Sequence, residues 1–328
     1  MDAHRRLAAP LALIVVAAGL WIGARPSHAG SDDVARLVPS DVAAIDVTDW
    51  SRGDATDDSD LTARSVLSGA GEVIADGLGW TPETVRWEAF VQTTTGTAAL
   101  IALPGSADAT AERLRRVGYE RDGTGLWHAD GAALRGDGRS APTVFTNVRL
   151  LPDHGVAVAS EEPSVVEELA DVAAGRSPSL ADDPTLASIW SRRAGLAAYS
   201  LQGQAAGCAS TDPAQAGEEV AAQARVAVGA VGELRAYRWL LRGMDARAAR
   251  FEVAMAFDSG TQAAEQATTR ARLSAGVFIG QTGDVEDSIV LRDHRASGDV
   301  AVLDFERQER AVALMSFTGP MVFASCPA

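Results

Sequence analysis

Three histidines are the first candidates for chemistry after residue 29: His128, His154 and His294. Imidazole can hold zinc or act as a general base. The three lie far apart in the sequence, no HExxH-type spacing exists, and neither a G-x-S-x-G elbow nor a G-x-G-x-x-G cradle is present. The spacing therefore predicts no catalytic residue, no metal ligand and no cofactor, although a triad assembled from distant residues stays open.

Acidic residues form a second candidate site near the N-terminus. Hard cations such as Ca²⁺ need several oxygen ligands. An EF-hand would also need glycine at its sixth position and glutamate at its twelfth, and both are missing. We expect a solvated acidic loop, with the last of its residues as a helix N-cap. The residues are Asp46, Asp49, Asp54, Asp57, Asp58 and Asp60.

Ser179, Asp182 and Asp183 lie in a third polar stretch, "SPSLADDPTLASIW". Asp183 followed by Pro184 is typical of a helix N-cap and first helical position. No histidine is near in the sequence. Capping explains the stretch, which we expect to be the boundary between two folded units.

The basic residues exclude several chemistries. All 29 are arginine. Schiff-base, P-loop and Ser–Lys mechanisms need a lysine, and arginine cannot replace it because it stays protonated in proteins. These mechanisms are therefore excluded. The net charge of −15 repels phosphate backbones, which argues against nucleic-acid partners.

The N-terminus has the layout of a secretory signal. Arg5 and Arg6 precede an apolar run over residues 7–23, and a small-x-small site follows with cleavage between Ala29 and Gly30. Retention of residues 7–23 as a membrane tether is the alternative. Both readings predict an extracytoplasmic protein, either secreted or anchored to the outer face of the membrane. An exported chain with two cysteines usually pairs them, so we expect a Cys208–Cys326 disulfide, with two buried free thiols as the alternative.

Periodicity predicts an α+β chain. The expected elements are a strand over 41–50, a helix from Asp60 to Leu78, a hairpin over 86–103, a helix over 107–118, strands near 125–130, 143–150 and 155–160, and a helix over 161–175. A strand over 195–202, a helix over 213–231, a hairpin over 235–257 and a helix over 261–275 follow. Four strands close the chain, over 288–293, 299–305, 311–317 and 321–325.

The two halves repeat this order. Ile45 and Tyr199 lie at the same interval as Ala99 and Val253. We therefore expect two similar halves, each an antiparallel sheet with helices packed on one face. The expected division is a signal peptide or anchor over 1–29, a spacer over 30–40, a first half over 41–176, a connecting segment over 177–194 and a second half over 195–328.

A family resemblance rests on "DHGVAVASEEPSVVEELADVAAGRSPSLADDPTLASIW", with "LVPSDVAAIDVTD" and "AALIALPGSADATAERLRRVGYE". These segments resemble a bacterial family of exported or membrane-tethered proteins of unknown function. The resemblance implies a repeated α+β architecture and brings no catalytic residues. The low aromatic content and the lack of lysine depart from it.

The leading hypothesis is a non-enzymatic binding or interaction protein of the cell envelope, whose partner is an unknown envelope protein or an apolar ligand. The alternatives are an envelope hydrolase with a non-obvious site and a carrier of an apolar ligand. A carrier would need an apolar groove between sheet and helices. Six tryptophans could either line such a groove or pack the core: Trp50, Trp80, Trp87, Trp127, Trp190 and Trp239.

Overall fold

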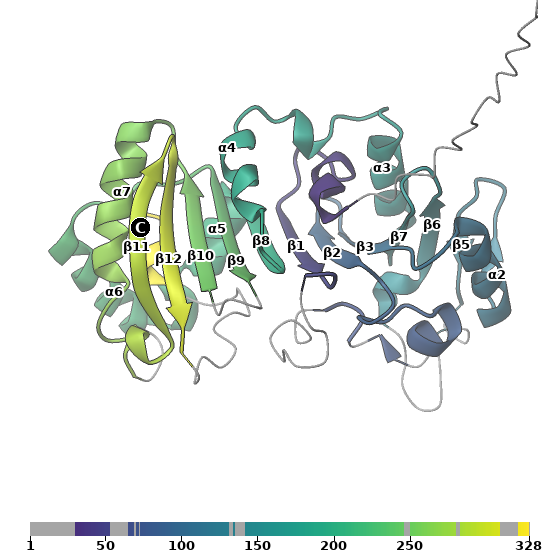
Figure 1. Cartoon of the computed structure of the whole chain (residues 1–328), viewed down its shortest axis with the longest axis horizontal. Coiled ribbons are helices and arrows are strands. Elements are labelled where there is room, and N and C mark those ends of the chain that lie inside the picture. Colours follow the sequence, from purple (N-terminus) through teal and green to yellow (C-terminus); the bar gives the residue numbers. More distant parts are fainter. Residues whose placement is uncertain are drawn as a thin grey trace, which may run out of the picture.

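A single antiparallel sheet organises the molecule (Figure 1). The computed structural model describes residues 30–52, 65–68, 70–71, 73–130, 134, 142–245, 250–279, 283–308 and 321–327. Within them, twelve strands lie in the order β11-β12-β10-β9-β8-β1-β2-β3-β7-β6-β5-β4. The strands are β1 (Ala44–Asp49), β2 (Trp87–Gln92), β3 (Thr97–Ala102), β4 (Glu120–Arg121), β5 (Trp127–His128), β6 (Asn147–Leu151), β7 (Val156–Ser160), β8 (Ala198–Gly203), β9 (Trp239–Asp245), β10 (Arg250–Ala256), β11 (Ile289–Ser297) and β12 (Val300–Arg307).

The centre of the sheet is the pairing of β1 with β8. Ala44 lies opposite Gln202 and Thr48 lies opposite Ala198 in an antiparallel register. The two expected sheets are therefore joined as one, because the open edges of β1 and β8 satisfy each other's backbone hydrogen bonds.

Alternation along each strand divides the core into two layers. In β3, Leu100 packs in one hydrophobic cluster, whereas Ile101 packs in the other. Successive side chains of a strand point to opposite faces, so both faces of the central strands are buried, whereas the edge strand β11 is largely exposed.

Helices cover both faces. The helices are α2 (Ala107–Val117), α3 (Pro163–Ala173), α4 (Ala187–Trp190), α5 (Gln204–Thr211), α6 (Glu218–Val231) and α7 (Gly260–Leu273). Leu114 of α2 and Ala263 of α7 pack in the cluster of Ile101, whereas Leu169 of α3 and Ile189 of α4 pack in the cluster of Leu100. The expectation of helices on one face is wrong for the first half, where α2 and α3 lie on opposite faces of the sheet, whereas α5, α6 and α7 of the second half all pack on the face of Ile101.

Several expected elements are confirmed. The β2–β3 and β9–β10 hairpins form as the alternation predicts. Helix α2 begins after Ser106, whose hydroxyl accepts from the Ala109 amide at 3.2 Å, and ends at Gly118 with φ 103°.

Other elements differ from expectation. Of the helix expected from Asp60 to Leu78, the described part holds a π-helical turn, η2 (Val73–Leu78), while Asp60 lies outside the described residues. The helix expected over 213–231 is divided at Gly217, where φ is 111°, into a 3₁₀ turn, η6 (Pro213–Ala216), and α6.

The expected C-terminal strand over 321–325 is also wrong, since this segment forms a 3₁₀ turn, η9 (Val322–Ala324). The carbonyls of Phe323 and Ser325 accept hydrogen bonds from the side chain of Arg270 on α7 rather than from a neighbouring strand. The strand expected over 311–317 lies outside the described residues.

The stretches expected as spacer and connector pack against each other. Residues 30–40 form a 3₁₀ helix, η1 (Ser31–Arg36), with Val38 buried. The Leu180 amide donates to the Val38 carbonyl at 2.9 Å, and Leu180 is itself buried. Both stretches therefore cover the cluster of Leu100.

Candidate functional site

A disulfide joins α5 to the C-terminal segment. Cys208 and Cys326 are bonded, with their Cα atoms 5.2 Å apart, as the two-cysteine count predicts. Structural disulfides are typical of oxidising compartments outside the cytoplasm. Of the expected cleavage site, Ala29 lies outside the described residues, and Gly30 is the first that the structure describes.

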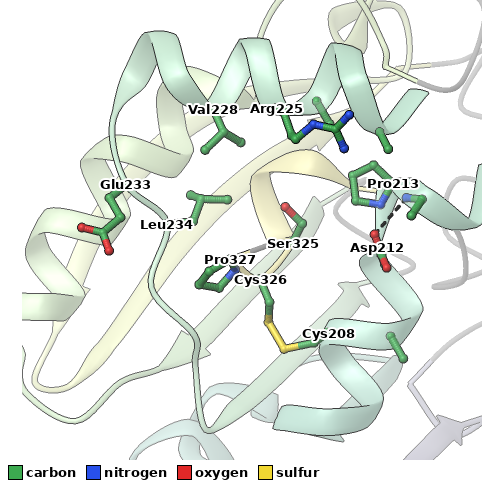
Figure 2. A pocket seen from close by; sticks show the side chains of 14 residues that line it. Cys208, Asp212, Pro213, Arg225, Val228, Glu233, Leu234, Ser325, Cys326 and Pro327 are labelled. Carbon is green, nitrogen blue, oxygen red and sulfur yellow. Dashed lines mark hydrogen bonds between the residues drawn. A yellow bond between two sulfur atoms is a disulfide. The ribbon is translucent and has the colours of Figure 1, made fainter. Parts of the chain in front are cut away.

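An apolar cavity of about 510 Å³ lies beside this disulfide (Figure 2). Helix α6 forms one wall, and α5, η6 and the residues that follow η9 form the others. The lining residues are Cys208, Ala209, Asp212, Pro213, Ala214, Ala221, Ala224, Arg225, Val228, Glu233, Leu234, Ser325, Cys326 and Pro327. The volume is within the range of roughly 300–1,000 Å³ of small-molecule sites.

The cavity exists because α6 does not lie on the sheet. Its main contacts are with η6 and α7, and among its residues, all of them described, only Ala224 is buried. Ala221, Ala224 and Val228 have helical spacing and line the cavity together. The face of α6 that carries Ala221, Ala224 and Val228 therefore lines the cavity instead of packing on a strand.

Arg225 belongs to the same stripe. It lies four residues after Ala221 and three before Val228, and it lines the cavity. Figure 2 shows its side chain on the cavity side of α6, toward Pro213. Among the described residues it has no hydrogen bond or ion pair.

The two acidic residues of the lining, Asp212 and Glu233, each have a partner within the protein. Asp212 Oδ1 accepts from the Ala214 amide at 2.8 Å. Glu233 pairs with Arg235 at 3.2 Å. Arg225 is therefore the one charged side chain of the lining without a described partner.

The floor of the cavity is fixed by a buried arginine of α7. Arg270 is completely buried and donates to the carbonyls of Phe323 and Ser325 from Nη1, each at 2.9 Å, and to that of Arg235 from Nη2 at 2.8 Å. Burial lowers the pKa of Arg270 to about 10. These bonds hold the C-terminal segment in place with the disulfide.

The three histidines lie apart. His128 of β5 contacts Asp122 at 3.2 Å and Asn147 at 2.7 Å, His154 contacts the Ala173 carbonyl at 3.1 Å, and His294 is on β11. None lines the cavity. Within the described ranges, no group of three or more potential ligands could hold a metal ion.

The acidic and serine candidates have structural roles. Asp49 is buried and accepts from Ser31 at 2.6 Å. Ser179 and Asp182 form a reciprocal capping box, which explains why the pKa of Asp182 is lowered.

The remaining acidic candidates differ in how far the structure describes them. Asp183 accepts from the Thr185 amide at 2.7 Å and is not the N-cap of α4, which is Leu186. Asp46 is on β1. Asp54, Asp57, Asp58 and Asp60 lie outside the described residues.

The tryptophans pack the core. Trp80, Trp87 and Trp127 are fully buried, Trp50 and Trp239 are nearly so, and Trp190 is half-buried. None of these six tryptophans lines the cavity. The signal that sequence reasoning missed is an arginine on the Ala/Val stripe of residues 221–228.

Glu88 is a second residue that sequence reasoning missed. It is buried on β2, with 3% of its surface exposed, and Oε2 accepts from the Leu67 amide at 3.2 Å. Burial raises the pKa of Glu88 to about 7.

Comparison with known proteins gives little. No family model and no curated protein matches the chain. A solved structure titled "Structure of crystal form I of TP0453" is similar over 86% of this chain and 95% of that chain, at 9% identity and a TM-score of 0.45. That level of similarity does not establish a shared fold.

In the part of the chain that the structure describes, no helix combines the length and the apolar character needed to span a bilayer. Residues 7–23 lie outside that part.

Proposed function

We propose that this protein is an exported, non-enzymatic binding protein of the cell envelope and that it holds an apolar ligand in the cavity beneath α6. The single observation that carries the proposal is the 510 Å³ apolar cavity at the disulfide. Its walls are mainly alkyl groups, which bind apolar surface by excluding water from it.

The structure around the cavity supports a binding role. Cys208–Cys326 and Arg270 hold two of its walls, so the space does not depend on a ligand to form. A preformed pocket binds with less loss of conformational entropy. Ala221 and Ala224 are small, and this keeps the cavity open.

Export is supported by the disulfide, by the signal-like N-terminus and by the resemblance to exported proteins of unknown function. An envelope location would place the cavity where apolar molecules have to cross an aqueous space.

Titration with N-phenyl-1-naphthylamine, a neutral probe that fluoresces in apolar surroundings, tests the proposal. The full chain should bind one probe per molecule. Ala224→Phe should weaken binding at least tenfold, because the ring would fill the space beneath α6. Ala230→Phe, on the exposed side of the same helix, is the matched control and should bind as the parent does.

Val228→Trp is a second way to fill the cavity if Ala224→Phe does not fold, and circular dichroism decides that point. Equal probe binding by the parent and by both filled variants would overturn the proposal. Native mass spectrometry of the protein from its own envelope should show an added small mass, and an added protein mass in its place would favour an adaptor role.

We also infer that the two halves are one repeated unit. Outward from the β1–β8 pair the order is β1-β2-β3-β7-β6 on one side and β8-β9-β10-β12-β11 on the other. Ile45 and Tyr199 share one core layer, and Ala99 and Val253 share the other. The cavity lies in the second half alone, which would assign binding to one copy of the repeat.

A further inference from the structure

We infer that the ligand of the cavity is an anionic amphiphile, a single apolar chain with a carboxylate or similar acidic head, and that Arg225 binds the head. The inference rests on the proposed function and adds the ligand's charge and orientation to it. Three observations carry it: the place of Arg225, the state of the neighbouring charges and the volume of the cavity.

Arg225 interrupts an otherwise apolar stripe. Ala221, Ala224 and Val228 would form a continuous apolar face, and Arg225 adds a guanidinium to that face at the cavity wall. The guanidinium is exposed and has no described partner, so its five N–H donors are available to a ligand. Planar carboxylate and phosphate groups match this donor fork.

Arg225 is the one charged side chain of the lining whose hydrogen-bonding groups all lack a described partner. Asp212 already accepts a backbone amide through Oδ1, and Glu233 pairs with Arg235. The protein as a whole carries −15, so an anion is repelled everywhere except near a local cation. Arg225 supplies that cation.

The volume sets the length of the ligand. Water occupies roughly 30 Å³ per molecule in the liquid, and a methylene group is of similar size. The 510 Å³ of the cavity would therefore hold about 17 non-hydrogen atoms. Dodecanoate is a fitting probe of this size.

Figure 2 indicates the orientation. Arg225 lies toward Asp212 and Pro213, whereas Leu234 and Glu233 lie at the opposite side of the space. The head would therefore sit beside Arg225 and the chain would run past Val228 and the disulfide toward Leu234. The chain would contact alkyl groups and sulfur along this path.

Calorimetric titration of the full chain with dodecanoate, dodecanol and dodecyltrimethylammonium tests the inference. Dodecanoate should bind at least tenfold more tightly than the cation. Arg225→Gln should weaken dodecanoate binding about tenfold, because a charge-assisted bond is lost, and leave dodecanol unchanged. Arg225→Glu should reverse the preference between the two ions. Arg272→Gln, an exposed arginine of α7 outside the cavity, is the matched control and should bind as the parent does.

The outcomes separate the two proposals. If dodecanol binds but Arg225→Gln leaves dodecanoate affinity unchanged, the head-group inference is overturned and the apolar cavity stands. If no probe binds the parent and N-phenyl-1-naphthylamine also fails, the proposed function itself is overturned. If Arg225→Gln also loses dodecanol binding, Arg225 maintains the shape of the cavity rather than binding the head group, and this result also contradicts the inference.

Discussion

At the scale of single residues, Arg270 has a charge that no carboxylate balances among its described contacts. Carbonyl oxygens receive its N–H groups, and the rings of Tyr237 and Phe257 lie 5.7 Å from its guanidinium carbon. Cation–π contacts and several carbonyl dipoles together replace part of the lost hydration.

Arg270→Leu should lower the free energy of unfolding by about 3 kcal/mol or more, because buried carbonyls would lose their donors. Urea denaturation measures this. Arg272→Leu, exposed on the same helix, should change the free energy by less than about 0.5 kcal/mol. A small effect at Arg270 would mean that the C-terminal segment does not depend on it.

Glu88 should make stability depend on pH. Its pKa is about 7 in the folded protein against 4.5 when exposed, so the folded state holds the proton more tightly. Stability is therefore lost as pH rises from 4.5 to 7, by roughly 3 kcal/mol in all. Glu88→Gln should match the parent near pH 5 and be the more stable protein at pH 8, which urea midpoints at the two pH values measure.

Glu112→Gln is the control for that experiment, since Glu112 is exposed on α2. Its difference from the parent should be the same at both pH values. If Glu88→Gln behaves in this way too, the buried carboxyl does not titrate between pH 5 and 8.

Residue-level prediction from sequence succeeds where the cause is local. The Ser106 cap and the Gly118 terminus follow from neighbouring residues, and the cysteine pair follows from their number. Arg225 and Glu88 could not be found in this way. Their surroundings come from segments that are distant in the sequence, and the same side chains on other surfaces would be ordinary.

At the scale of elements, the C-terminal segment, residues 321–327, pairs with none of the described strands. Its position therefore depends on the disulfide and on side-chain hydrogen bonds. Replacing both Cys208 and Cys326 by alanine should lower the free energy of unfolding by about 4–5 kcal/mol, the chain-entropy value for a loop of 118 residues. Amide exchange over residues 321–327 should rise, and N-phenyl-1-naphthylamine should bind more weakly because a cavity wall is released.

Reduction of the parent should reproduce all three changes: the lower free energy of unfolding, the faster amide exchange and the weaker probe binding. Unchanged exchange over 321–327 after reduction would show that the hydrogen bonds from Arg270 and Thr211 and the buried side chains hold the segment without the disulfide.

Element type was predictable where periodicity is strong. The hairpins and α2, α3 and α7 follow from alternation and helical spacing. The C-terminal segment reads as a strand because its apolar residues are contiguous, but its carbonyls bond to Arg270 and it becomes η9. The break at Gly217 separates η6 from α6, which both line the cavity, and helical periodicity alone does not predict this break.

At the scale of the whole molecule, one sheet joins both halves. Periodicity predicted an antiparallel α+β chain, and this is confirmed. The joining of the halves was not predicted, because pairing of β1 with β8 depends on two strand edges that meet only in three dimensions. The helices on the second face were not predicted for a related reason. The sequence of a strand that is apolar on both faces shows that the strand is buried, but it does not show which helices cover each face.

The position of β1 between β2 and β8 leaves one of its edges unpaired while the chain is being made. One side of β1 pairs with β2 soon after it is made, but the other side waits for β8, and Ala44 waits for Gln202. Throughout that interval an exposed row of amides and carbonyls is open to strands of other nascent chains. A holdase that shields this edge until β8 emerges would therefore increase the yield of native protein.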